Sequence, residues 1–234
     1  MKGIIYLIPN TLGESPIDYN LPEENIRLIN AIKHFIVEDI RTARRFLKKV
    51  NKEIDIDALK FYVLDKHTSQ QEIPSFLLPA LNGHDMGILS EAGCPGVADP
   101  GADVVAIAHQ KNLRVTPLIG PSSILLSMMA SGMNGQSFAF NGYLPAGKGE
   151  NIKVIKQLEE RSIREKQTQI FIETPFRNTK LMQDLLFALR PTTRLCIAAD
   201  ITLSSEYIVT KTVAQWQGKL PDLSKRPAIF LIQG

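Results

Sequence analysis

The sequence predicts an α/β protein with two α/β domains, and three observations support this fold class. Short apolar runs alternate with amphipathic windows along most of the 234 residues, which is the pattern of strands joined by helices. The alternation restarts near Gly120-Pro121, so we expect an N-terminal domain of residues 1–119 and a C-terminal domain of residues 120–234. In the second domain, two predicted strands follow each other without a helix between them, which favours a mixed sheet.

The N-terminal domain is predicted to hold a wound, mostly parallel sheet, because helical windows separate its apolar runs. The runs are short enough for buried strands, and turn-forming residues lie between the elements. The predicted strands are Ile4–Ile8, Phe35–Val37, Phe61–Leu64, Gly87–Leu89 and Val115–Ile119. The predicted helices are Glu23–Ala31, Thr42–Val50, Ile73–Leu81 and Ala102–Gln110.

The C-terminal domain is predicted to begin with an apolar helix over Ile124–Ala130. Ser122 and Ser123 can cap this helix, because a hydroxyl oxygen accepts a hydrogen bond from the free amides of the first turn. Further helices are predicted over Ile152–Glu160, over Asn178–Leu189 and around Trp216. The predicted strands are Phe138–Phe140, Gln169–Ile172, Leu195–Ala199, Glu206–Thr210 and Ala228–Ile232.

The composition is that of an ordinary globular protein, with 44% hydrophobic and 22% charged residues. No apolar stretch approaches the roughly 20 residues that a membrane-spanning helix needs, so we expect no membrane segment. Cys94 and Cys196 are the only cysteines, which argues against a disulfide framework and favours a reducing cytoplasm. The histidines lack metal-ligand spacing, so no metal site is expected. A net charge of +3 does not by itself indicate nucleic-acid binding.

The run Ser90–Gly101 is the first candidate for a ligand site. It contains three glycines and two prolines where a predicted strand gives way to a helix. Such a junction leaves backbone amides free, and glycine lets a ligand approach them closely. In an open α/β sheet, ligands bind beyond the carboxyl ends of the strands. A purely structural turn explains the run equally well.

The nucleotide-binding motifs Gly-x-Gly-x-x-Gly and Walker A are absent, which argues against a pyrophosphate cofactor. A ligand with an adenosine and a carboxylate but no phosphate, such as S-adenosylmethionine, remains compatible, because helix amides can hold the carboxylate. Cys94 could be a nucleophile, but no histidine lies near it in sequence. A small residue packed in a tight turn is the favoured interpretation.

Two groups of charged residues follow predicted strands. Glu38, Asp39 and Arg41 follow Phe35–Val37, and they could act on a substrate or form the acidic start of a helix. Glu173 and Arg177 follow Gln169–Ile172 and could orient a substrate. The competing interpretation there is that Thr174 caps a helix whose first residue is Pro175.

Basic residues are concentrated in two helical windows. The window Arg41–Lys49 can present one basic face, which is either a solvated surface or a contact for phosphates. Lys148, Lys153 and Lys156 allow the same two interpretations.

An ordered set of motifs covers nearly the whole chain. The motifs are Pro9-Asn10, Val37–Arg41, Ser90–Gly101, Gly120–Ser123, Ala130–Gly132, Phe140–Pro145, Lys148–Glu150 and Phe171–Arg177. This set resembles the tetrapyrrole methylase superfamily of S-adenosylmethionine-dependent methyltransferases. Within it, the chain is most similar to the branch that methylates a cytidine ribose 2′-hydroxyl in small-subunit ribosomal RNA.

The resemblance implies two α/β domains with S-adenosylmethionine in the cleft between them, in a cytoplasmic homodimer that acts on ribosomal RNA or the small ribosomal subunit. It also implies a set of cofactor contacts, of which Cys94 would act through its backbone. These are Leu12, Glu91, Cys94, Val97, Ser122, Ser123, Ile172, Glu173, Pro227 and Ala228. Glu38, Asp39 and Glu173 are then candidate bases, and Arg41 and Arg177 candidate phosphate or substrate orienters.

The chain departs from the ribosomal RNA branch in three motifs. Ile8–Gly13 replaces Thr-Pro-Ile-Gly-Asn-Leu, Glu173–Arg177 lacks a histidine, and Ala199–Leu203 lacks two cations. One alternative is therefore a diverged paralogue that methylates another RNA or a tetrapyrrole-like molecule, although the first loop lacks the Gly-x-Gly-x-Gly of tetrapyrrole enzymes. Another alternative is a non-enzymatic RNA-binding protein with the same fold.

Overall fold

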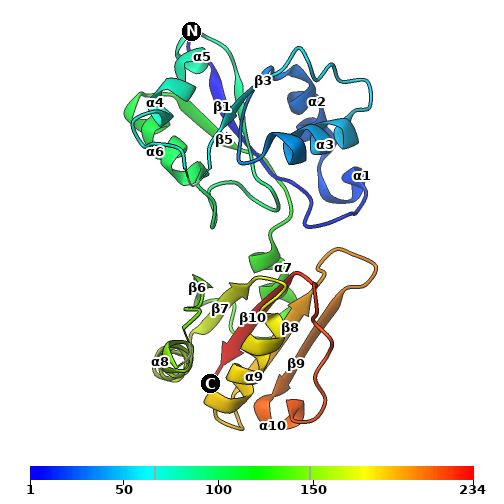
Figure 1. Ribbon diagram of the computed structural model, residues 1–234, viewed down its shortest axis with the longest axis vertical. Helices are drawn as coiled ribbons and strands as arrows, with labels where there is room; N and C mark the ends of the chain where they lie inside the picture. The colour runs from blue at the N-terminus through cyan, green and yellow to red at the C-terminus, as the bar shows by residue number, and fades with distance from the viewer. Residues whose placement is uncertain (66, 148) are drawn as a thin grey trace. The chain divides into compact units, whose positions relative to one another are not determined.

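The computed structural model describes residues 1–65, 67–147 and 149–234. It divides into two compact units, the N-terminal unit Met1–Ser122 and the C-terminal unit Ser123–Gly234. The sequence-based division lies between residues 119 and 120, and the structure-based one follows the Gly120-Pro121 segment. Each unit contains one sheet with helices packed against it (Figure 1).

In the described part of the N-terminal unit, five strands form a parallel sheet. They are β1 (Ile4–Ile8), β2 (His34–Val37), β3 (Lys60–Val63), β4 (Met86–Leu89) and β5 (Arg114–Pro117). Their order across the sheet is β3-β2-β4-β1-β5. The central strand β4 is buried at every residue, as expected of a parallel strand covered on both faces. The predicted wound sheet is therefore confirmed.

Helices cover both faces of this sheet. They are α1 (Ile17–Asn20), α2 (Glu23–Ala31), α3 (Ile40–Val50), α4 (Ile73–Phe76), α5 (Leu78–Leu81) and α6 (Gly101–Gln110). Residues of α2 and α3 form one core with Ile8, Phe35 and Leu89. Residues of α4, α5 and α6 form another core with Ile5 and Ile88. Figure 1 shows these two groups of helices on opposite sides of the strands.

The single helix expected over Ile73–Leu81 is wrong, because the structure divides this segment into α4 and α5 at Leu77. Pro79 explains the division. Its ring has no amide hydrogen to donate, and in a continuous helix it would clash with the carbonyl of Ser75. The short helix α1 was not predicted, because four residues are too few to produce a periodic pattern.

In the described part of the C-terminal unit, five strands form a mixed sheet in the order β6-β7-β10-β8-β9. The sheet has parallel pairing only between β6 and β7, whereas the other described pairs are antiparallel. The mixed sheet inferred from consecutive strands without a helix is thus observed. The strands are β6 (Phe138–Tyr143), β7 (Thr168–Glu173), β8 (Arg194–Ala199), β9 (Tyr207–Thr212) and β10 (Ala228–Gln233).

Four helices lie in the described part of this unit: α7 (Ser123–Ser131), α8 (Glu150–Glu165), α9 (Asn178–Ala188) and α10 (Val213–Trp216). Residues of α8, α9 and α10 share one apolar core with alternate residues of β7, β8 and β10, including Phe171 and Phe230. The apolar helix α7 packs against β9 and β10, and Thr210 donates a hydrogen bond to the carbonyl of Ser131 at 2.8 Å.

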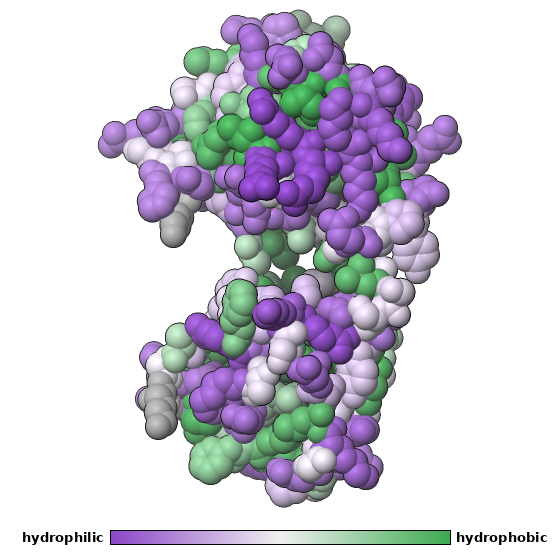
Figure 2. All heavy atoms as spheres, turned by 45° about the vertical axis from the view of Figure 1, so that its right-hand side comes forward, coloured by the Kyte–Doolittle hydropathy of each residue, from purple (hydrophilic) through white to green (hydrophobic). Residues whose placement is uncertain are grey.

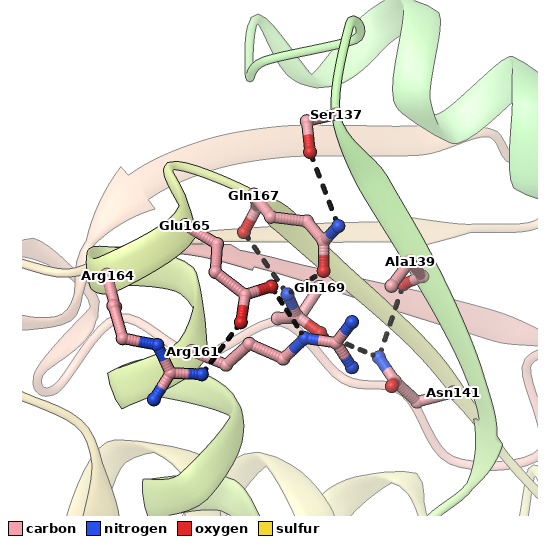
Figure 3. A network of polar contacts seen from close by, with 8 residues as sticks. All are labelled: Ser137, Ala139, Asn141, Arg161, Arg164, Glu165, Gln167 and Gln169. Carbon is pink, nitrogen blue, oxygen red and sulfur yellow. Dashed lines mark hydrogen bonds and ion pairs between the residues drawn. The ribbon is translucent and has the colours of Figure 1, made fainter.

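A polar network joins β6 to β7 where their pairing is irregular (Figure 3). Asn141 Nδ2 donates to the side-chain oxygen of Gln169 at 3.2 Å and to the carbonyl of Ile170 at 3.3 Å. Gln169 is completely buried and donates in turn to Gln167. The network satisfies a buried amide that would otherwise destabilise the sheet.

Within the residues that the structure describes, no helix combines the length and the apolar character needed to cross a membrane.

Candidate active site

The candidate site of the N-terminal unit lies at the carboxyl edge of its sheet. Strands β2, β4 and β1 are adjacent and parallel, and Leu89 pairs with both Val37 and Ile8. The residues that follow these strands therefore leave the sheet side by side. Glu38 follows β2, and the run beginning at Ser90 follows β4. This is the edge at which ligands bind in open α/β sheets.

Asn10 joins the first loop to the Ser90–Gly101 run. Its Nδ2 donates to the carbonyls of Ser90 and Glu91 at 3.2 and 3.0 Å, and its Oδ1 accepts the amide of Thr11 at 2.8 Å. The main chains of Asn10 and Gly93 also exchange hydrogen bonds of 2.9 and 3.1 Å. Because Asn10 is buried, its side chain fixes both loops in one arrangement.

Asp99 shapes the rest of the run. Its Oδ1 accepts the amides of Gly96 at 2.7 Å and of Gly101, the first residue of α6, at 2.8 Å. Gly93 and Gly96 have positive φ angles of 70° and 78°, which glycine adopts without strain. The run is therefore an ordered turn whose shape depends on glycine and on one carboxylate.

Glu38 is the most perturbed carboxyl group at this edge. Burial raises its pKa to about 7, and the negative charges of Asp99 and Glu91 act in the same direction. No salt bridge within the described residues involves Glu38, Glu91 or Asp99. A group with a pKa near 7 can accept a proton at neutral pH, so Glu38 has the properties of a general base.

Asp39 is held differently. It caps α3, because its carboxylate accepts the amide of Thr42 at 2.7 Å, and this bond lowers its pKa. The helix-start interpretation thus accounts for Asp39 but not for Glu38. Arg41 is exposed in the first turn of α3. We therefore take Glu38 forward as the candidate base, with Arg41 as a candidate orienter.

Cys94 lies against the segment that ends the unit. Its thiol donates to the carbonyl of Pro121 at 3.4 Å, and burial raises the pKa of the thiol, which disfavours the nucleophilic thiolate. A Cβ on Gly120 would lie 2.2 Å from Cγ of Pro9, so only glycine allows this close approach. Asn25 holds the segment from the other side by donating to the carbonyl of Ile119 at 2.7 Å.

The structure therefore brings several predicted cofactor contacts of the N-terminal unit together. Leu12 lies beside Gly93, where a Cβ would approach the Leu12 side chain to 3.3 Å; Cys94 follows that glycine and Glu91 lies two residues before it. Ser122 follows Pro121, the partner of Cys94. Val97 lies farther along the turn with its side chain half exposed.

The remaining predicted contacts lie in the C-terminal unit, whose first residue is Ser123 at the start of α7. In the sheet, Ala228 pairs with Glu173 and Ile229 pairs with Ile172. Pro227 precedes β10, and its carbonyl accepts the amide of Asp200 at 3.0 Å. Ile172, Glu173, Pro227 and Ala228 thus share one end of this sheet.

Glu173 is buried and interacts with its own loop. It accepts the amide of Thr174 at 2.6 Å and forms an ion pair with Arg177 at 2.5 Å. The competing interpretation, in which Thr174 caps a helix starting at Pro175, is wrong, because α9 begins at Asn178, the start predicted for this helix. The carbonyl of Thr174 instead accepts the amide of Arg177 at 2.9 Å, which forms a turn. A cavity of about 590 Å³ adjoins Glu173 and Arg177 and extends between α8 and α9.

Three polar residues of these edges were missed by the sequence analysis as functional positions. Asn10 and Asp99 organise the first site, and Asp200 forms an ion pair of 2.7 Å with Arg226 in the second unit. Asn10 and Asp99 lie within the motifs Pro9-Asn10 and Ser90–Gly101, and this membership is the sequence signal that could have identified them. Of the second basic group, Lys153 and Lys156 are exposed on α8, and Lys148 lies outside the described residues. Across those residues, no cluster of His, Cys, Asp or Glu could hold a metal ion.

Sequence comparisons identify relatives along the full chain, although no family model matches it. The chain is 26% identical over 234 residues to the ribosomal RNA small subunit methyltransferase I of Vibrio cholerae. This alignment covers 99% of this chain and 77% of that protein. The protein of the same name from Escherichia coli O157:H7 is 24% identical over 236 residues, covering 100% and 78%. That of Streptococcus pyogenes is 30% identical over 188 residues, covering 79% and 60%.

Solved structures show the same fold. The methyltransferase CobJ superimposes with a TM-score of 0.65 and 16% identity, covering 100% of this chain and 95% of that one. Uroporphyrin-III-C-methyltransferase from Thermus thermophilus gives a TM-score of 0.55 and 18% identity, covering 100% and 93%. These two structures confirm the predicted fold class. The resemblance that the motifs indicated is supported by the sequence relatives.

Proposed function

We propose that this chain, which is related along its whole length to ribosomal RNA methyltransferases, is an S-adenosylmethionine-dependent methyltransferase that modifies a ribose 2′-hydroxyl in small-subunit ribosomal RNA. The full-length similarity to proteins named ribosomal RNA small subunit methyltransferase I carries this proposal. Such an activity fits a cytoplasmic protein, and the resemblance favours a homodimer.

The residues at the first carboxyl edge fit a cationic cofactor. Glu38, Glu91 and Asp99 form a negative region, and repulsion from the other two helps keep Glu38 partly protonated. A sulfonium near these carboxylates would relieve this repulsion. Leu12, Glu91 and the backbone at Cys94 are the proposed cofactor contacts of the N-terminal unit. Ile172, Glu173 and Ala228 are those of the C-terminal unit.

When bound, the cofactor supplies a methyl group on an electrophilic sulfonium. The protein must then position the acceptor hydroxyl and remove its proton. Glu38 accepts that proton, because its pKa of about 7 leaves much of it ionised at neutral pH. Arg41 and Arg177 are the candidates for orienting the RNA backbone, because a guanidinium binds phosphate with two parallel hydrogen bonds.

The proposal predicts methyl transfer to ribosomal RNA. We expect the purified protein to transfer labelled methyl from S-adenosylmethionine to small subunits from a strain lacking the corresponding gene, and mass spectrometry of nucleosides to place the label on a ribose. Subunits from the parent strain, already modified, are the control. Cofactor binding without label on a ribose would indicate a different methyl acceptor. No detectable binding at millimolar cofactor would exclude both methyltransferase hypotheses and favour the non-enzymatic one.

The Asn10 side chain is expected to support cofactor binding. Asn10→Ala removes the hydrogen bonds to the carbonyls of Ser90 and Glu91, of which the Ser90 bond is buried, at a cost of about 1–3 kcal/mol. We expect the Kd for S-adenosylmethionine in calorimetry to rise roughly 10-fold, which corresponds to about 1.4 kcal/mol. Asn20→Ala is the matched control, since Asn20 bonds only locally to Ser15 and Pro16 in the described structure. Equal Kd values for the two variants would contradict the role of Asn10.

A further inference from the structure

Helix α3 carries a stripe of three cations, Arg41, Arg45 and Lys49, which we call the basic stripe. The three residues are four positions apart, so they lie on one side of the helix with about 6 Å of rise between neighbours. All three are exposed. Figure 2, which turns the side of the N-terminal unit bearing α2 and α3 towards the viewer, shows hydrophilic residues gathered over that side.

The basic stripe borders the candidate site. A cavity of about 170 Å³ lies between α3 and the first loop, and its lining includes Arg45, Lys49, Asn10 and Glu91. At the other end of the stripe, Arg41 lies two residues after Asp39, the cap of α3, and Glu38 precedes that cap. The cations therefore run from this cavity towards the candidate base.

The fold of α3 does not require these charges. Ala43, Phe46 and Leu47 bury the opposite side of the helix in the core. Cations four residues apart repel each other by about a few tenths of a kcal/mol, and Arg41 in the first turn opposes the helix dipole. Lys49 in the last turn complements the dipole, but Arg41 and Arg45 contribute nothing of this kind.

The basic stripe also lacks strong neutralising partners. Among the described residues, Arg41 and Arg45 have no salt bridge, and Lys49 has one, at 3.4 Å to Glu14. The Glu14 side chain is 88% exposed, so this pair is weak. Asp39 interacts electrostatically with Arg41, and Glu14 and Glu91 line the same cavity as Arg45 and Lys49, so the stripe is partly compensated. Three exposed cations with only weak ion pairs beside a candidate active site favour a polyanion as the partner.

We propose that the ribose-phosphate backbone of the RNA substrate binds along Arg41, Arg45 and Lys49, with the phosphates leading the chain towards Glu38. This inference rests on the proposed function and adds the surface that positions its substrate. RNA fits better than an acidic protein segment, because regularly spaced cations match a backbone with one charge per nucleotide.

The test compares two triple variants of equal charge change. Arg41→Gln/Arg45→Gln/Lys49→Gln removes the basic stripe. Lys33→Gln/Lys60→Gln/Arg114→Gln removes three exposed cations from the opposite, amino-terminal edge of the same sheet, at the starts of β2, β3 and β5. Binding of a labelled single-stranded RNA is followed by fluorescence anisotropy at several salt concentrations, and cofactor binding by calorimetry.

We expect loss of the basic stripe to weaken RNA binding roughly 10- to 100-fold at low salt. The slope of log K against log salt should become shallower by about 2, since each single-strand phosphate contact contributes about 0.7. The control triple should keep the wild-type slope, and both variants should keep the wild-type Kd for S-adenosylmethionine.

Three results would overturn the inference. The first is an unchanged salt slope after loss of the basic stripe. The second is an equal loss of RNA binding in both triples, which would indicate only general charge attraction. The third is loss of binding to polyglutamate with unchanged RNA binding, which would assign the stripe to an acidic protein. Methyl transfer by the wild type is measured separately, so failure of the proposed function is distinguished from failure of the stripe.

Discussion

Glu38→Gln is expected to lower kcat for methyl transfer by about 10²–10⁴-fold, the usual contribution of a general base. Glutamine keeps the size of the side chain and removes the group that accepts the hydroxyl proton. The Kd for S-adenosylmethionine should change much less than kcat. Single-turnover transfer of labelled methyl to RNA measures the first quantity, and calorimetry the second.

The pH dependence of the reaction gives a sharper test of the same residue. Because Glu38 must be ionised to accept a proton and its pKa is about 7, log kcat/KM should rise with pH and level off above pH 7. Glu38→Gln should remove this ionisation from the profile. If Asp39→Asn removes it instead, the wrong carboxylate has been chosen. Asparagine also caps helices well, so that variant should fold normally.

Stability should respond in the opposite direction to activity. The raised pKa means that folded Glu38 holds its proton up to about pH 7, whereas an unfolded glutamate loses it near 4.5. The stability associated with this proton is complete below pH 4.5 and is lost as the pH rises through 7. The Tm of Glu38→Gln minus the Tm of the wild type should therefore increase between pH 4.5 and pH 8. A variant that loses activity while gaining Tm at pH 8 cannot owe that loss to unfolding.

Trp216→Ala is expected to destabilise the C-terminal unit by about 3–5 kcal/mol, the range for truncating a buried aromatic residue. Trp216 is completely buried, its Nε1 donates to the carbonyl of Leu195 at 2.9 Å, and Lys211 lies 4.6 Å from its ring centre. Because Trp216 is the only tryptophan, unfolding must be followed by circular dichroism and calorimetry rather than by its fluorescence.

Trp216→Phe separates packing from hydrogen bonding, since it keeps an aromatic ring and removes the donor to Leu195. Trp216→Phe should lower the free energy of unfolding by about 1–3 kcal/mol, less than Trp216→Ala does. A calorimetric transition that belongs to the N-terminal unit should keep its position in both variants. Equal destabilisation by phenylalanine and alanine would show that the hydrogen bond, not the packing, dominates.

The sheets were readable from the sequence because their strands are nearly continuous apolar runs. β1 was predicted with its observed bounds, and the two units have the expected parallel and mixed sheets. Errors arose where local and tertiary signals compete. Pro79 divides one apolar window into two short helices, and the loop after Glu173 forms a turn before α9 begins. Short-range sequence patterns do not predict the exact residue at which a helix begins or ends, because a single backbone hydrogen bond can determine it.

The sequence by itself determined the α/β class, the strand ends that carry the candidate site residues and the kind of protein this chain resembles, since these depend on periodicity and on ordered motifs. Only the tertiary structure distinguished Glu38 from its neighbour Asp39. Burial and the charges of Asp99 and Glu91 raise the pKa of Glu38, whereas a hydrogen bond from the amide of Thr42 lowers the pKa of Asp39. Adjacent carboxylates with the same local pattern thus differ because electrostatic energies depend on distances in space that a sequence does not contain.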